Sequence, residues 1–457
     1  MDAFEKQLKD RLPLATAVLE ALHFAFPDSF LNSEIWNRYR GRCYDDTLSF
    51  PTFLRLIRDA LLEHGGSGHR ACVESLRRNA LPVDDSNVYR KLAHIPVEVS
   101  RALLRLGTVR LTELVAPQIT LLPACFEDFE AVAMDGHKVK RAARRLKPTR
   151  GFSGALLGAK AMVAMSLRTG LALAMSDSLD GEANDVPLVP TLLPQVREVV
   201  ARPILWLADR QFADYHIPRR LQQRPDDHFA IRLRNRLKFE ADPAVRARRT
   251  TDMEGRTVID ETGTYGNGAN VYRVRRITLI RGKGLDDVVV ITDLTDRGRF
   301  SALDLLKLYA HRWGIEIMFQ QVTETFGLKH LIGCEPQAVL FQLAFCLLIY
   351  NVIQVLKAYV AGDGKVERSA VSTANLFYDV KRELQTWSYL ALPAPASEAA
   401  DAAAMRSRLR ELLRGSWDAV AYLKAVSKKK RHYPPKKTQG VAGAHTSVQR
   451  LLEEANS

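Results

Sequence analysis

Residues 204–212 read ILWLADRQF, and this run constrains the fold more than any other segment of the chain. It is nearly all apolar, has the length of a strand, and therefore predicts a strand buried on both faces at the centre of a sheet. A helix is expected just before it, between Asp185 and Val200. Strand-like runs come earlier in the chain: AVAMDGHKV at 131–139, KAMVAMSL at 160–167 and LALAMSDSL at 171–179. Three strands, a helix and a central strand indicate an α/β core.

Further strands are expected after this core. FAIRLR, YRVRRITLI and DDVVVITDL fall between residues 225 and 292 and predict an inserted β-sheet. Helical periodicity returns at Ser301, a suitable N-cap, and runs to Phe326 before Gly327. The chain therefore divides into five expected regions: a helical N-terminal region at 1–125, the first part of the core at 126–224, the inserted strands at 225–292, the second part of the core at 293–360, and a helical C-terminal region with a basic tail at 361–457.

The helical expectation for the N-terminal region rests on spacing. Phe50–His64 places apolar residues on one side of a helix, and Val97–Leu114 follows Pro96, which suits a first turn. A third segment, Pro336–Leu356, carries no formal charge over 21 residues and is long enough to cross a bilayer. Glutamine and asparagine interrupt it and no second segment resembles it, so we interpret it as a buried helix of a protein without a membrane partner.

The charge balance favours a nucleic-acid partner. Lysine and arginine outnumber aspartate and glutamate by 66 to 52, for a net charge of +14. Because many basic proteins bind no nucleic acid, the clustering of these residues matters more than their sum. One acid-free block falls within residues 138–150 and another within 424–437, and either could bind several phosphates or remain a solvated loop. The DNA-binding candidates in these blocks are Lys138, Lys140, Arg141, Arg144, Arg145, Lys428, Lys429, Lys430 and Arg431.

Several other chemistries are not indicated. GFSGALLGAK lacks the spacing of a phosphate-binding loop, and HExxH is absent. The cysteines form no CxxC pair and lie far apart, which signals neither a zinc site nor a disulfide framework and fits a reducing cytoplasm. They are Cys43, Cys72, Cys125, Cys334 and Cys346.

Three acids are the candidates for catalysis. Asp135 and Asp209 sit at the ends of expected neighbouring strands, and Glu316 lies in the helix after the insertion. Carboxyl ends of such strands converge on one rim, where carboxylates can hold divalent ions for phosphodiester transfer. Each acid also has a structural alternative: a hairpin turn at Asp135-Gly, a salt bridge for Asp209, and an i,i+4 pair of Glu316 with Arg312.

The helix around Glu316 carries a specific pattern. YAHRWGIE places Tyr309, Arg312 and Glu316 at offsets of three and four, on one helical face. It resembles the Y-x2-R-x3-E opening of the signature of IS4-family insertion-sequence transposases, with Asp135 and Asp209 at the first two acidic positions. The resemblance covers residues 130–356, about half the chain.

The resemblance implies an RNase H-like catalytic core with a β-strand insertion, in which Asp135, Asp209 and Glu316 bind two Mg²⁺ ions, replaceable by Mn²⁺. It implies cutting and joining of transposon-end DNA, with Tyr309 and Arg312 near the scissile phosphate. The implied partners are terminal inverted repeats and target DNA, within a homodimer in a synaptic complex, in the bacterial cytoplasm at the nucleoid. The N-terminal helices would bind DNA ends, with a generic helical domain as the alternative.

One departure from the signature sets up a rival interpretation. The family has a lysine at the position of Thr323, so one phosphate contact is absent here, whereas the three acids are present. The rival is a catalytically inactive or domesticated transposase that still binds DNA; a basic scaffold protein without DNA is a third reading and leaves the acids unexplained. His137 is a weak candidate ligand because Mg²⁺ disfavours imidazole. Trp206 and Trp313 are expected in the core, and Tyr265 and Tyr272 are candidates for base stacking.

Overall fold

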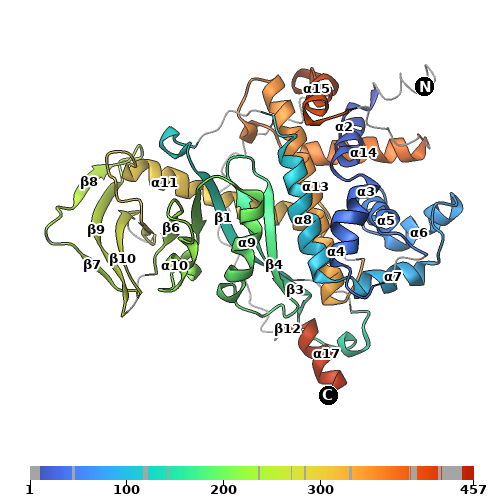
Figure 1. The fold of residues 1–457 in the computed structure, drawn as a ribbon, viewed down its shortest axis with the longest axis horizontal. Coiled ribbons are helices and arrows are strands. Elements are labelled where there is room, and N and C mark those ends of the chain that lie inside the picture. Colours follow the sequence, from blue (N-terminus) through green and yellow to red (C-terminus); the bar gives the residue numbers. More distant parts are fainter. Residues whose placement is uncertain are drawn as a thin grey trace.

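The computed structural model describes most of the 457-residue chain. The described residues are 11–43, 47–116, 122–140, 144–234, 237–268, 270–282, 285–328, 332–390, 392, 399–419, 424 and 445–457. Strands of the expected insertion lie at one end of the molecule, the core sheet lies in the middle, and helices from both ends of the chain gather at the other end (Figure 1).

A mixed ten-stranded sheet organises the molecule, in the order β4-β3-β1-β5-β6-β11-β10-β9-β7 with β8 also paired to β9. Its strands are β1 (Glu130–Val139), β3 (Ala159–Ser166), β4 (Ala172–Ser178), β5 (Ile204–Ala208), β6 (His228–Arg232), β7 (Phe239–Ala241), β8 (Arg248–Thr251), β9 (Thr257–Asn267), β10 (Asn270–Leu279) and β11 (Val288–Thr292). A separate short pair joins β2 (Leu156–Leu157) to β12 (Thr446–Ser447).

The core half of the sheet confirms the expected α/β class. β1, β3 and β4 form an antiparallel meander, and β5 then lies parallel to β1. The connection from β4 to β5 contains α9 (Val189–Val199), which packs on β4 and β3. All five residues of β5 are buried, as its apolar sequence predicts for a central strand. This arrangement is the RNase H-like core expected from the resemblance.

The boundary of the insertion differs from the expectation. FAIRLR contains β6, and β6 pairs in parallel with β5 through Leu205↔His228 to Ala208↔Ile231, so this strand belongs to the core. β11 pairs antiparallel with β6, which joins the inserted strands to the core edge to edge in one sheet. Periodicity shows that a segment is a strand but not which neighbour it pairs with. The remaining domain boundaries stay predictions.

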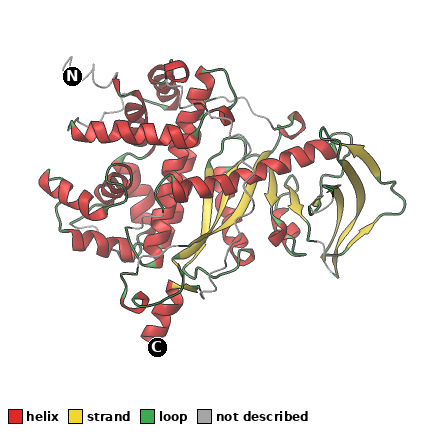
Figure 2. Ribbon diagram, turned by 180° about the vertical axis from the view of Figure 1, so that it is seen from behind, coloured by secondary structure: helices red, strands yellow, loops and turns green. Residues whose placement is uncertain are grey.

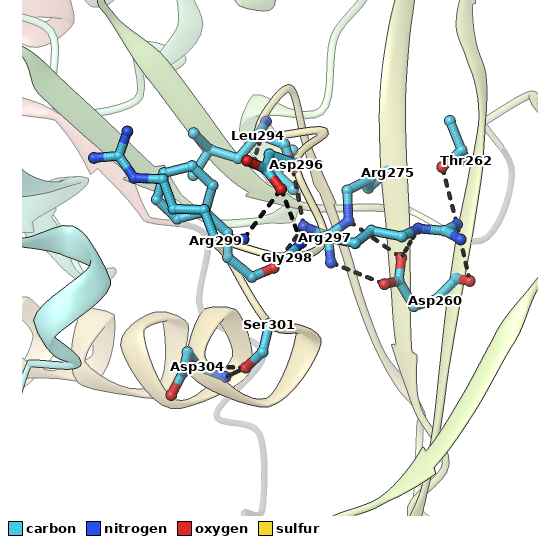
Figure 3. A network of polar contacts seen from close by, with 12 residues as sticks. Asp260, Thr262, Arg275, Leu294, Asp296, Arg297, Gly298, Arg299, Ser301 and Asp304 are labelled. Carbon is cyan, nitrogen blue, oxygen red and sulfur yellow. Dashed lines mark hydrogen bonds and ion pairs between the residues drawn. The ribbon is translucent and has the colours of Figure 1, made fainter.

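A buried ion pair ties the inserted strands to the start of the next helix (Figure 3). Arg275 on β10 is fully buried and donates two hydrogen bonds to Asp260 on β9, at 2.8 and 3.2 Å. Its Nη1 also donates to the carbonyls of Leu294 and Phe300, at 3.0 and 2.8 Å. These two residues flank the turn that leads from β11 into α11 (Ala302–Ala310). The guanidinium therefore fixes that turn against the inserted strands.

Helices form the other half of the molecule, which Figure 2 shows from behind. The N-terminal helical elements are α2 (Pro13–Ala25), α3 (Asp28–Phe30), the π-helical segment η1 (Leu31–Trp36), α4 (Asn37–Tyr39), α5 (Phe50–Leu62), α6 (Gly68–Arg77), α7 (Asp85–His94) and α8 (Val97–Thr112). Those after the core are α13 (Pro336–Asp363), α14 (Thr373–Tyr389), α15 (Ala402–Leu412), α16 (Ser416–Ala419) and α17 (Val448–Asn456). The helices expected from Phe50 and from Val97 are confirmed.

The long apolar helix α13 lies in the core, where it packs against α8 and, like α8, against the sheet. Among the described residues it is the single unbroken helix with the length and hydropathy of a membrane span, and that apolar stretch is wholly buried by the rest of the protein. Its polar residues have partners: Asn351 bonds both backbone groups of Ala172 at the start of β4 and the hydroxyl of Thr108 on α8. The expectation of a buried helix is confirmed.

The last residues of the chain return to the core, which no sequence pattern indicated. β12 pairs in parallel with β2, and Arg450 on α17 forms ion pairs with Asp180 and Glu182 beyond β4. The basic block at 425–437 falls outside the described residues.

The two ion pairs between β9 and β10 provide a matched test of burial. We expect Arg275→Met to lower the free energy of unfolding by about 3–5 kcal/mol, because it removes both hydrogen bonds that Arg275 donates to the buried Asp260 carboxylate and leaves that carboxylate only the Nε of Arg297, 3.5 Å away, as an ion-pair partner among the described residues. The neighbouring pair Arg276–Glu261 has a similar N···O distance, 2.7 Å, but is part-exposed. Arg276→Met should therefore lower the free energy of unfolding by about 1 kcal/mol or less. Urea unfolding followed by circular dichroism measures both, and equal losses would contradict the assignment.

Candidate active site

The first two acids occupy adjacent positions on neighbouring strands. β1 and β5 pair in parallel up to Met134↔Ala208, and Asp135 and Asp209 are the next residue on each strand. Asp135 is itself in mid-strand, paired with Val163 of β3, so the hairpin-turn alternative is wrong. Among the described side chains, none forms an ion pair with Asp209, so its salt-bridge alternative is not observed either.

The third acid is delivered by the helices that follow the insertion. Ser301 caps α11 by accepting a hydrogen bond from the Asp304 N–H at 3.1 Å, as expected. The run is not one continuous α-helix, because the 3-10 turn η6 (His311–Trp313) separates α11 from α12 (Gly314–Glu324). Glu316 lies in the first turn of α12 with its side chain 31% exposed.

Tyr309 and Arg312 hold this region together. The Tyr309 hydroxyl donates to the carbonyl of Ala208, the last residue of β5, at 3.1 Å. Arg312 Nη2 donates to Glu316 Oε1 at 2.7 Å, and its Nη1 lies 3.9 Å from Asp135 Oδ2. Both side chains are largely buried. The i,i+4 pair expected as the structural alternative for Glu316 is therefore present, and the same guanidinium also links Glu316 to Asp135.

The three acids line one open cleft of about 700 Å³. α12 contributes the face that carries Glu316, Gln320 and Thr323, at helical spacing. The basic candidates Lys138 and Lys140 line the same cleft, from the end of β1. The structure thus brings Asp135, Asp209, Glu316, Lys138 and Lys140 together.

A fourth acid in the cleft escaped the sequence analysis. Asp185 lies against Gly136, where an added Cβ would stand only 1.9 Å from its Oδ1, so glycine is required beside Asp135. Asp185 pairs with Lys160 on β3 at 2.6 Å, and both side chains are buried. No motif marks either residue, because their pairing depends on how β1, β3 and the loop after β4 meet.

Burial and neighbouring charges perturb the pKa of Asp135. Burial raises the pKa of Asp135 to about 6, and Glu316 and Asp185 add to the increase through their charges. Arg312 and the Gly136 N–H, which donates to Asp135 Oδ1 at 2.9 Å, oppose it. Asp135 therefore keeps its proton to a higher pH than an exposed aspartate does.

The donor set suits a hard divalent cation. Three carboxylates offer only oxygen, the ligand type that Mg²⁺ prefers, and they face a cleft open to solvent. As they stand, no three His, Cys, Asp or Glu side chains of the described residues are close enough to hold a metal ion together. Arg312 lies between two of the acids, and its buried Nη1 and Nε have no hydrogen-bond partner among the described residues. A metal ion would thus share or replace the positive charge that Arg312 provides.

His137 and Thr323 form a small packed contact in this cleft. The imidazole stacks on Phe319 of α12 with 4.6 Å between ring centroids, and its Nε2 lies 3.5 Å from Thr323 Oγ1. Burial lowers the pKa of His137 to about 4. The position that carries lysine in the IS4 signature is therefore occupied by a hydroxyl beside a histidine.

The other basic candidates are placed differently. Arg144 and Arg145 are exposed and donate to the backbone carbonyls of Gly154 and Ile332, at 2.7 and 3.3 Å. Arg141, Lys428, Lys429, Lys430 and Arg431 lie outside the described residues. The DNA-binding role of the whole set stays a prediction.

A second groove lies beside the cleft, between α11 and the inserted strands, with a volume of about 640 Å³. Arg312 and Tyr309 line it, as do Lys307, Arg281 and Arg232. Its end is formed by Trp313, which is 58% exposed. The expectation that Trp313 is a core residue is wrong, whereas that for Trp206 is confirmed.

The two candidates for base stacking in the insertion, Tyr265 and Tyr272, differ in burial. Tyr265 is fully buried against Tyr215 and so offers no face to a base. Tyr272 donates its hydroxyl to the Tyr215 carbonyl at 2.9 Å and is part-buried.

Comparisons with known proteins agree with this geometry. The family model described as Transposase DDE domain matches residues 128–352, a span that contains Asp135, Asp209 and Glu316. A curated protein of Sinorhizobium fredii (strain NBRC 101917 / NGR234), named "Putative transposase y4zB", is 29% identical over 117 residues. That match covers 24% of this chain and 32% of the relative, about a third of its length.

Among solved structures, the cryo-EM structure of a piggyBac transposase synaptic complex with hairpin DNA is similar over 87% of this chain and 85% of that one. The identity is 12% and the TM-score 0.40, so the strand order of the core, and not this overlap, carries the assignment of the fold. Over residues 128–352 the chain belongs to the family of transposase DDE domains.

Proposed function

We propose that this protein is a Mg²⁺-dependent DNA transposase of the IS4 type, which cuts transposon-end DNA and joins it to a target. The observation that carries the proposal is the convergence of Asp135, Asp209 and Glu316 on one solvent-open cleft walled by Lys138 and Lys140. Acids alone would repel a phosphodiester, and lysines alone would bind it without cutting. Together they suit a polyanionic substrate that needs divalent cations for its chemistry.

Asp135, Asp209 and Glu316 are the proposed ligands of two Mg²⁺ ions, with Mn²⁺ as a substitute. Bound ions of this kind activate the attacking oxygen and stabilise the leaving one. The residues of the chain position this centre: the Tyr309 hydroxyl holds the end of β5 that presents Asp209, and Arg312 holds Glu316 toward Asp135. Arg312 also has donor capacity to spare, which suits a phosphate oxygen near the scissile bond.

The groove beside the cleft offers a path for the rest of the DNA strand. Lys307, Arg281 and Arg232 line it and have no ion-pair partner among the residues that the structure describes, whereas Arg256 in its wall is neutralised by Asp252 and Glu254. Trp313 exposes a broad apolar ring at its end. Unpaired cations and an exposed aromatic ring are what a phosphate backbone with an unstacked base would contact.

The proposed partners are terminal inverted repeats and target DNA, bound by a homodimer in a synaptic complex in the bacterial cytoplasm. The alternative is a transposase-derived protein that binds DNA without cutting it. Thr323 in place of the signature lysine favours that alternative, and the retained arrangement of the three acids favours the enzyme.

The decisive measurement is strand cleavage of DNA carrying the ends that flank the coding region, in Mg²⁺ or Mn²⁺. We expect nicking by the wild-type protein and a loss of at least about 10³-fold in Glu316→Gln, the scale of losing a catalytic group, with DNA affinity retained. Glu324→Gln, the same change two turns along α12 in the same cleft, should keep cleavage. Binding without cutting by the wild type in either metal would establish the alternative.

A pH dependence follows from the pKa of Asp135, raised to about 6 by burial. Below that pH the carboxyl keeps its proton and loses the charge that attracts a cation, so Mn²⁺ affinity should fall about tenfold per pH unit below about 6 and level off above it. Electron paramagnetic resonance of free Mn²⁺ measures the affinity. Asp135→Asn should bind weakly with no such bend, and a bend of equal size in that variant would refute the assignment.

Thr323 can be tested by restoring the signature lysine. Because position 323 lines the cleft, Thr323→Lys should add one phosphate contact and steepen the slope of log affinity against log salt by about 0.9. Thr386→Lys, the same change at an exposed site on α14, is the control for added charge. Equal slopes in the two variants would show that position 323 does not face the DNA.

A further inference from the structure

A separate cavity, open to solvent on one side, lies on the other side of α12. It has a volume of about 240 Å³ and is formed by the β3–β4 turn, α12, α13 and the start of α14. α12 gives it Gly314, Ile317 and Gln321, whereas Glu316 from the same helix lines the catalytic cleft. At roughly 30 Å³ per water molecule, the cavity has room for several waters or a small ligand.

One buried and one part-buried cation lie in its wall. Lys357 on α13 is 9% exposed, and its Nζ donates to Thr373 Oγ1 at 2.9 Å. Arg368, in the 3-10 turn η7 (Arg368–Ala370), lies so close to Gly170 that an added Cβ would stand 2.6 Å from its Nη1. That Nη1 is buried and has no hydrogen-bond partner in the described part of the chain.

These cations lack a matching carboxylate. Glu367 is the acid in the lining, but no ion pair within 4.0 Å joins it to Lys357 or Arg368 in the described structure. Arg168 also faces the cavity but pairs with Glu130 at 3.9 Å, and burial lowers the pKa of His311, so the unmatched positive charge is that of Arg368 and of protonated Lys357. Burying unpaired charge costs several kcal/mol per ion, and a bound anion would offset that cost.

We propose that this cavity binds a tetrahedral oxyanion, the phosphate group of either a free ion or a DNA backbone. The planar fork of Arg368 suits two oxygens of such a group, and Lys357 and the Thr373 hydroxyl supply further donors. The site is separate from the catalytic cleft and does not depend on the proposed cleavage activity.

Proton uptake is the signature of this site. Burial, together with the charge of Arg368, lowers the pKa of Lys357 to about 7, and Glu367 opposes the decrease. The other groups that face the cavity are Tyr350 on α13, His311 in η6 and Arg168 in the β3–β4 turn. A bound anion favours protonated Lys357, so binding should take up a proton above neutral pH and strengthen as the pH falls.

The test is calorimetric titration of the full-length protein with sulfate, which does not itself titrate near neutral pH, in buffers of different ionisation enthalpy. We expect one sulfate per chain, with proton uptake, and a loss of at least about tenfold in affinity in Arg368→Met. Arg382→Met, at an exposed arginine on α14, should bind as the wild type does.

A second variant distinguishes a direct loss of sulfate binding from a loss caused by misfolding. Ile317→Glu leaves both cations in place and sets a carboxylate at the exposed mouth of the cavity, so it should compete with sulfate. Absence of sulfate binding in the wild type, or full binding in both Arg368→Met and Ile317→Glu, would overturn the proposal.

Competition with duplex DNA distinguishes a backbone phosphate from a free anion as the ligand. If DNA competes with sulfate and Arg368→Met lowers the salt slope of DNA binding by about 0.9, the ligand is a backbone phosphate. If sulfate binds and Arg368→Met leaves the salt slope of DNA binding unchanged, the ligand is a free anion. Cleavage assays test the proposed function independently, so the two can fail separately.

Discussion

The buried guanidinium of Arg275 connects the inserted strands to the turn before α11. These two parts of the chain must be held in place for the proposed catalytic centre to form. It bonds Asp260 across the inserted strands and the carbonyls of Leu294 and Phe300 at the turn into α11. From that turn, Ser301 starts α11, and Tyr309, Arg312 and Glu316 follow within five helical turns. The inserted strands therefore do not loosen the third acid, because Arg275, and Arg297 in the same turn, bond the returning chain to β9.

Charge compensation explains the state of the cleft. Burial and the charges of Glu316 and Asp185 raise the pKa of Asp135, while Arg312 lowers it and pairs with Glu316, and Lys160 pairs with Asp185. Such a site is stable when empty and gains from added positive charge, which is what a cation-binding centre requires. Lys138 and Lys140 line the same cleft as the acids, so positive charge is also available to an approaching phosphate.

Much of the core was predictable because its signals are local. The apolar run of β5, the alternation in β1 and β3, and the spacing of Tyr309, Arg312 and Glu316 each follow from a few consecutive residues. What failed depends on pairing over distance. β6 carries no mark of its neighbour, Asp185 reaches Lys160 through the fold, and α17 returns across the chain to Asp180. The prediction for Trp313 failed for another reason: tryptophan is usually largely buried, yet this one ends the 3-10 turn η6 and is exposed.

The edge-to-edge pairing of β11 with β6 has a mechanical consequence. β11 and β6 are hydrogen-bonded through the pairs Val290↔Arg232, Ile291↔Ile231 and Thr292↔Ala230. The inserted strands and the core therefore form one continuous sheet and deform together. A swinging motion about a hinge would have to break backbone hydrogen bonds in the middle of a sheet. We therefore expect a bulky substrate to be accommodated by a change of sheet twist that is spread over many strands. A force applied to the insertion would then be transmitted to the strands that present Asp135 and Asp209.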